Sequence, residues 1–165
     1  MIKSDEGTKR SYGESGFAAH WVQTFEMCLV QQQLACQNLE SVADSLPVLL
    51  NVDEVLALSL SLVTALKDIH SFEEDDIFPK LVSHAARWHA IIETVERLKS
   101  EHLEDEDYAL NVCTALQEYL TKQDHRSSEN LGWMLRGLFE TIRRHVAFER
   151  EHILPLVNQI ARADH

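Results

Sequence analysis

The chain has 165 residues, of which 45% are hydrophobic and 25% charged, and it carries a formal net charge of −12. This length suits one domain with a substantial core. The negative charge disfavours nucleic acid and anionic membranes as partners, and no apolar run approaches the ~18–20 residues of a membrane span. With only five Gly and three Pro, the sequence favours a few long helices over many short strands.

Hydrophobic periodicity predicts four long helices, because apolar residues recur at steps of three and four along four segments. Pro47 ends the first segment, and Asn51 followed by Glu54 resembles a capping box that opens the second. Four helices with short links predict an all-α fold, an up-down-up-down antiparallel four-helix bundle. The predicted helices span residues 17–46, 52–82, 88–120 and 129–161.

Details of the core follow from the same pattern. In the second helix the predicted buried face includes Leu56 and Leu60. Trp88 of the third helix and Trp133 of the fourth are also expected in the core. Gly132 and Gly137 are expected where two helices approach closely, rather than at helix breaks.

The first residues and the cysteines indicate where such a protein works. Residues 1–15 are polar and carry no signal peptide, so we expect a disordered lead-in to a domain at 16–162. Cys28, Cys36 and Cys113 form no CxxC pair and lie in apolar helical segments. They are therefore expected to be reduced and buried, as is typical of a cytoplasmic protein.

Three of the predicted core stripes contain His and acidic residues where apolar side chains should continue. Burying such groups without partners costs several kcal/mol, in the range of ~2–7 for one polar group, so something must satisfy them. Residues four apart share one face of a helix. The groups are His70 with Glu73 or Glu74 in the second helix, His102 in the third, and His145 with Glu149 in the fourth.

These groups are predicted to meet at one level of the bundle. In antiparallel helices, residues equally far from a connecting turn lie at equal depth. His70 and His102 are about equally far from a turn near residue 85, and His102 and His145 from a turn near residue 124. Imidazole and carboxylate are ligands for iron, manganese or zinc, and two carboxylates facing each other can bridge two ions. The sequence therefore predicts a metal site inside the bundle.

Taken together, the residues resemble those of the haemerythrin-like (HHE cation-binding) family. The resemblance covers about residues 17–160 and is carried by His70 with Glu74, by Glu101-His102 and by His145 with Glu149, with a Pro after the first and last groups. It implies a non-haem di-iron centre in which Glu74 and Glu149 bridge and the three His are terminal ligands. It also implies oxygen carriage or sensing, iron sensing, or protection and repair under nitrosative and oxidative stress.

Two departures from the family pattern matter. The spacing from His to Pro is ten residues in the fourth helix (145 to 155) but nine in the second (70 to 79), so Glu73 rather than Glu74 is an alternative ligand. The family also takes one His from the first helix, at a depth that corresponds to about residue 27. No His lies there, and His20 is about two turns too far out. Glu26, a glutamine or water is a possible substitute; weak binding, a single metal or no metal are the other outcomes.

Other polar residues have simpler interpretations. We interpret Glu106 and the acidic run at 104–107 as a solvated face that helps to attract cations. His152 is expected either to support the metal ligands from just outside the site or to pack at the helix end.

Three functions from different classes remain. The first is a di-iron protein that binds or senses O2, NO, peroxide or iron, with Mn or Zn as alternative metals. The second is a redox enzyme that handles O2 or peroxide, and the third a metal-poor bundle that works through protein partners. No nucleic acid or membrane partner is expected, whereas a protein partner or a homodimer is possible.

Overall fold

The computed structural model describes residues 12–49, 51–85, 90–122 and 127–163, and every regular element in these ranges is helical. Two of the elements are short π-helical turns that interrupt longer rods. In chain order the elements are α1 (Tyr12–Ser45), α2 (Val52–Phe72), η1 (Glu73–Ile77), α3 (Phe78–Ser83), α4 (Ile91–Lys122), α5 (Ser128–Phe148), η4 (Glu149–Ile153) and α6 (Leu154–Ala163).

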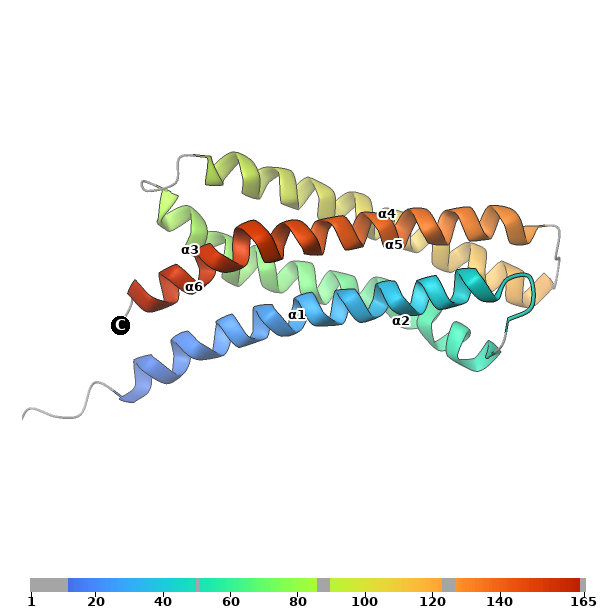
Figure 1. Ribbon diagram of the computed structural model, residues 1–165, viewed down its shortest axis with the longest axis horizontal. Helices are drawn as coiled ribbons and strands as arrows, with labels where there is room; N and C mark the ends of the chain where they lie inside the picture. The colour runs from blue at the N-terminus through green and yellow to red at the C-terminus, as the bar shows by residue number, and fades with distance from the viewer. Residues whose placement is uncertain (1–11, 50, 86–89, 123–126, 164–165) are drawn as a thin grey trace, which may run out of the picture.

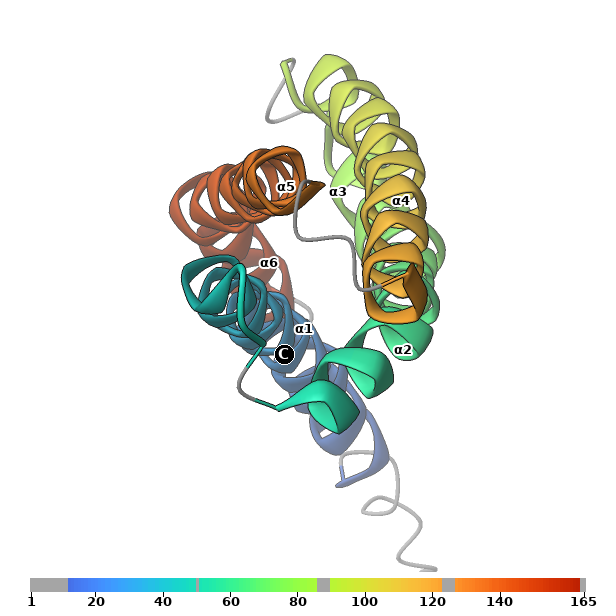
Figure 2. The same ribbon diagram turned by 90° about the vertical axis from the view of Figure 1, so that its right-hand side faces the viewer.

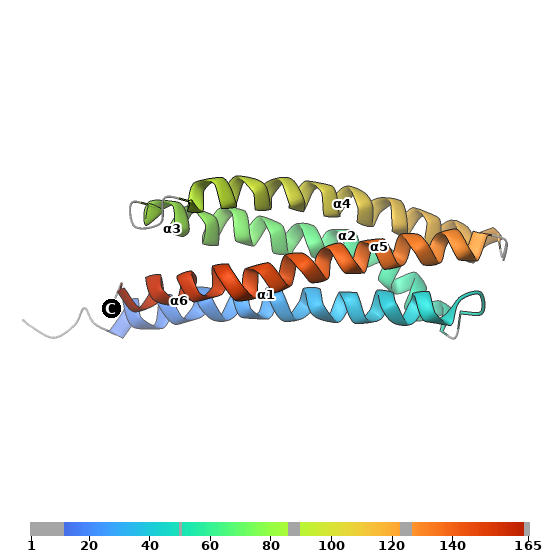
Figure 3. The ribbon, with the colours of Figure 1, turned by 45° about the horizontal axis from the view of Figure 1, so that its top comes forward.

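These elements make four antiparallel rods, because α2, η1 and α3 form one continuous rod and α5, η4 and α6 another (Figure 1). The rods pair: α1 packs mainly against α5, and α2 against α4. Figure 2 shows the two pairs from one end, and Figure 3 shows them as two layers, with α2, α3 and α4 in one and α1, α5 and α6 in the other. The predicted all-α, up-down-up-down bundle is confirmed.

The helix boundaries agree with those predicted from periodicity to within a few residues, except at the start. The first helix begins at Tyr12 rather than at residue 17, so the expected lead-in at 1–15 is helical from residue 12, and residues 1–11 lie outside the described ranges. The Asn51 cap is confirmed, because its side-chain oxygen accepts a hydrogen bond from the Glu54 N–H at 3.3 Å. Trp88 lies outside the described residues.

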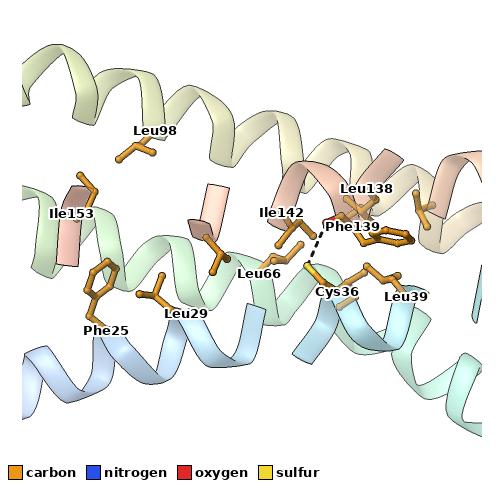
Figure 4. Packing of buried hydrophobic residues seen from close by; sticks show 14 of the residues in the cluster. Phe25, Leu29, Cys36, Leu39, Leu66, Leu98, Leu138, Phe139, Ile142 and Ile153 are labelled. Atoms are coloured by element: carbon orange, nitrogen blue, oxygen red, sulfur yellow. Dashed lines mark hydrogen bonds between the residues drawn. The ribbon is translucent and has the colours of Figure 1, made fainter. Parts of the chain in front are cut away.

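The core is a continuous apolar cluster along the bundle axis, and Figure 4 shows part of it, with Phe25 of α1 near Ile153 of η4 and Cys36 of α1 near Phe139 of α5. Burying one such side chain contributes about 1.5–3 kcal/mol. The thiol of Cys36 joins this packing and donates a hydrogen bond to a backbone carbonyl of α5 at 3.5 Å. The three cysteines are buried and free, as predicted.

Three residues predicted to lie in the core are exposed. Leu56 and Leu60 are 41% and 66% exposed, and Trp133 is 69% exposed. In α2 the buried face runs instead through Val55, Leu62, Leu66 and Ile69. Apolar residues occur on several sides of this helix, so the periodicity did not define a single buried face.

Gly137 lies where α5 closely approaches α4. A Cβ atom built on Gly137 would overlap the hydroxyl end of Tyr108, which lies in α4. The close helix contact expected at Gly137 is therefore confirmed.

The rod Val52–Ser83 is long and apolar enough, by length and composition alone, to cross a membrane, with a mean hydropathy of 1.4 over its qualifying window. This contradicts the expectation that no segment is apolar enough. Its inward side nevertheless lines the bundle, and 33% of the window is buried there. The same rod also carries the polar residues His70 and Glu73 into the interior, so we assign it to the bundle.

Candidate metal centre

Each of the two π-helical turns begins at a buried glutamate: Glu73 opens η1 and Glu149 opens η4. A proline follows each turn by two residues, at Pro79 and Pro155. Proline has no N–H, and in a regular α-helix its ring would clash with the carbonyl four residues earlier. A π-helical turn contains one extra residue, and such turns often occur at functional sites. The prolines thus give a local reason for the two turns.

The imidazoles of His70, His102 and His145 converge in the interior. The rings of His70 and His102 are stacked, with centroids 4.0 Å apart and planes 2° apart. The ring of His145 lies 5.0 Å from that of His102 and 6.2 Å from that of His70. All three side chains are buried, with at most 4% exposed. The sequence-based prediction that these residues share one level of the bundle is confirmed.

Four of the buried residues form a compact group of possible ligands: Glu73, His102, His145 and Glu149. Each offers one ligand atom, and these atoms all lie within 4.8 Å of one another. His102 Nε2 lies 3.2 Å from a Glu73 oxygen, and His145 Nε2 lies 3.4 Å from a Glu149 oxygen. Three different rods therefore bring two imidazoles and two carboxylates to one point.

Five atoms of this group are buried without a hydrogen-bond partner among the described residues. They are Glu73 Oε2, the Nε2 atoms of His102 and His145, and both carboxylate oxygens of Glu149. Leaving one buried polar atom unsatisfied costs about 1–3 kcal/mol, and more when it is charged. A cation among these atoms would satisfy them together, and imidazole nitrogen with carboxylate oxygen is a donor set that iron, manganese and zinc accept. The residues present therefore fit a bound metal ion.

A second set of carboxylates holds the outer nitrogen of each imidazole. Because Nδ1 of each ring contacts a carboxylate, its proton is held there and Nε2 is left free to face a metal. The pairs are His70 with Glu106 at 2.8 Å, His102 with Glu74 at 2.8 Å, and His145 with Glu101 at 3.2 Å.

Glu74 was expected to face the metal site, but the structure places it outside the group of possible ligands. Its carboxylate contacts the outer nitrogen of His102, and the alternative residue, Glu73, is the one that faces the cluster. Glu73 follows its histidine by three residues whereas Glu149 follows His145 by four, in keeping with the shorter spacing to Pro79. Reading Glu106 as a solvated residue was wrong, because it is paired with buried His70.

Sequence reasoning missed Glu101 and Glu106 as imidazole partners. Both lie on α4, and their partners lie on other rods, so no short-range motif records the contacts. The only available signal was their position beside and one turn beyond His102. His152 was expected either to support the site or to pack at the helix end. Its ring lies against that of Phe148, with centroids 4.7 Å apart, and its side chain is 52% exposed.

Helix α1 contributes a glutamine to the cluster. Gln32 is 1% exposed, and its amide donates a hydrogen bond to Glu73 Oε1 at 3.4 Å. Glu26, Met27 and Gln31 are exposed, as is His20. Of the substitutes considered for the absent histidine, the glutamine is therefore the one that the structure brings to the site.

Burial and charge change the protonation of the cluster. Burial raises the pKa of Glu73 well above its ordinary value, and the neighbouring Glu149 raises it further. Burial and the nearby imidazoles lower the pKa of His70 to about 2. Burial also lowers the pKa of His145, but the negative charges of the neighbouring Glu149 and Glu73 outweigh this and raise it to about 9. Without a cation, the cluster therefore carries a proton at neutral pH.

Comparison with known proteins agrees with this geometry. The family model of the hemerythrin HHE cation binding domain matches residues 23–157, which is most of the chain. No curated protein and no solved structure matches the chain.

Proposed function

Because the chain belongs to the hemerythrin HHE cation-binding family, we propose that it is a non-haem di-iron protein that binds or senses O2, NO or peroxide. The supporting observation is the group of five buried side-chain atoms without hydrogen-bond partners, which belong to four residues whose ligand atoms lie within 4.8 Å of one another. Neither an apolar core nor a surface ion pair accounts for such a group.

Glu73, His102, His145 and Glu149 would hold the metal, with His70 beside them. Nitrogen and oxygen donors suit iron, and also manganese or zinc, and two carboxylates have enough oxygens to serve a pair of ions. When bound, iron supplies the ability to bind or reduce a small oxidant. The protein's own residues keep the imidazoles in one tautomer through Glu74, Glu101 and Glu106.

Burial restricts what such a centre could bind. The two carboxylates of the cluster are 0% exposed, and the outer side chains of Glu74, Glu101 and Glu106 are only 18–35% exposed. A small molecule fits this access better than a large substrate does, which favours binding or sensing over turnover of a metabolite. Three buried, unpaired thiols are consistent with a reducing compartment, and we propose that the protein is cytoplasmic.

Metal analysis of protein produced with added iron tests this proposal. We expect about two iron ions per chain at saturating iron, as a di-iron centre requires. His145→Ala should abolish iron binding, whereas His20→Ala should leave it intact, since His20 is an exposed residue of the first helix. Protein that binds no iron, manganese or zinc would overturn the proposal and favour a metal-poor interaction bundle.

The spectrum of the iron-loaded protein then separates binding from catalysis. Reversible changes on adding and removing O2 or NO would support the binding function. Sustained, catalysed loss of peroxide would show a redox enzyme instead, and His145→Ala should remove either property.

A further inference from the structure

The cluster is not symmetric, because α1 presents an amide where the other rods present imidazoles and carboxylates. We propose that the centre has two ion positions of unequal affinity: a tight one among Glu73, His102, His145 and Glu149, and a weak one that would have to compete with Gln32 for the second oxygen of Glu73. This inference rests on the proposed function, since it requires that the cluster bind a cation.

The tight position follows from how close and how buried its ligands are. Their four ligand atoms lie within 4.8 Å of one another, and none of the four side chains is more than 4% exposed. Two of the ligands are carboxylates, so a divalent ion there is balanced by two negative charges. No other polar side chain among the described residues competes for their unpartnered atoms.

Gln32 weakens the other position by occupying one oxygen of Glu73. Glu73 Oε1 accepts the Gln32 amide at 3.4 Å, whereas Glu73 Oε2 has no hydrogen-bond partner. A carboxylate that bridges two ions needs both oxygens, so Glu73 is prepared to serve only one. The Gln32 side chain brings no negative charge of its own, and its amide N–H group repels a cation.

No imidazole or carboxylate of α1 compensates for the glutamine, and the buried thiol of Cys28 is the other donor of α1 near Glu73 and Glu149. The buried side chains around this level are Phe25, Cys28, Leu29 and Gln32, none of which is an imidazole or a carboxylate. His70 lies outside the compact group of four and stacks on His102 with centroids 4.0 Å apart. A second ion would therefore lack a charged ligand from α1 and would compete with Gln32 for Glu73 Oε1.

A titration of the metal-free full-length chain with Zn2+ alone measures both positions, because zinc is redox-inactive and accepts the same donors. We expect one tight equivalent and a second that binds at least about tenfold more weakly. Gln32→Glu keeps the shape of the side chain, adds a carboxylate and removes the N–H donor. It should strengthen the second step by ~10–100-fold, the range associated with residues that tune metal ligands.

Gln31→Glu is the matched control, because Gln31 is the preceding glutamine on α1 and is exposed. It makes the same change of charge away from the cluster and should leave both binding steps as in the wild type. Should Gln32→Glu not fold, as judged by circular dichroism, Gln32→His provides an imidazole at the same place and should have the same effect on the second step.

Two equivalents of equal affinity in the wild type would overturn the inference while leaving the proposed function in place. An unchanged second step in folded Gln32→Glu or Gln32→His would overturn it as well. If neither the wild type nor the variants bind Zn2+, iron or manganese, the proposed function fails, and this inference fails with it.

Discussion

Glu149→Gln tests most directly whether a cation accounts for the buried cluster. Glu149 is 0% exposed, and both of its oxygens lack a hydrogen-bond partner. The substitution preserves shape but removes one of the two negative charges that face the ion, the other being that of Glu73. Changes in residues that merely support metal ligands cost 10–100-fold in affinity. We therefore expect the loss of a charged ligand to cost about 100-fold, or ~2.8 kcal/mol.

Thermal unfolding with and without metal converts this loss into a measurable shift. At a metal concentration 100 times the wild-type dissociation constant, binding stabilises the wild type by ~2.7 kcal/mol. For a chain of this size that raises Tm by ~5–11 °C. The variant at the same concentration is near its own dissociation constant, so it gains only ~0.4 kcal/mol, or ~1 °C in Tm.

Glu151→Gln is the matched control for this experiment. Glu151 lies in the same π-helical turn, η4, but its side chain is 76% exposed. Removing its charge should leave the metal-induced rise in Tm unchanged. A full shift in Glu149→Gln, or the loss of the shift in Glu151→Gln, would refute the assignment of the cluster as the metal site.

Further predictions concern protonation, the thiols and one helix contact. Because the pKa of His145 is raised to about 9 in the metal-free protein, an ion must displace its proton at neutral pH. The affinity should therefore rise by up to ~10-fold per pH unit between about pH 6 and 8, with proton uptake by the buffer in calorimetry; a pH-independent affinity would contradict this. Burial raises the thiol pKa values to about 12 for Cys28 and to about 11 for Cys36 and Cys113. A thiol-specific reagent at about pH 8 should label none of them in the folded protein and all three in denaturant; rapid labelling of the folded protein would show that they are accessible. Gly137→Ala should destabilise the wild type, because the new methyl group meets Tyr108. In a Tyr108→Ala background it should instead stabilise by up to ~1 kcal/mol through helix propensity, and equal effects in both backgrounds would rule out the contact.

The level of the His/Glu cluster was predictable, whereas the choice between Glu73 and Glu74 was left open. The common depth of His70, His102 and His145 depends only on the constant rise of a helix and on where the chain turns. The choice between Glu73 and Glu74 stayed open because residues three and four beyond His70 both share its face of an α-helix. Only the packed structure shows that Glu73 joins the cluster while Glu74 contacts the outer nitrogen of His102.

Contacts between rods set the other limit. Glu101 and Glu106 pair with imidazoles on neighbouring rods, and these pairs depend on how the helices are rotated against each other. The same rotation decides which side of an apolar helix is buried, which explains why Leu60 and Trp133 are exposed. The composition of α1 did show that no imidazole was available at this depth, and the structure identifies Gln32 as the residue that lies there.

The two π-helical turns have an evolutionary consequence. Such a turn is equivalent to one extra residue inserted into an α-helix. Losing a single codon within η1 or η4 would remove that extra residue, and Pro79 or Pro155 would then have to fit a regular α-helix, where its ring clashes with the carbonyl four residues earlier. Each proline therefore opposes such a deletion, and a chain that loses the codon would have to lose the proline as well before a regular helix could form.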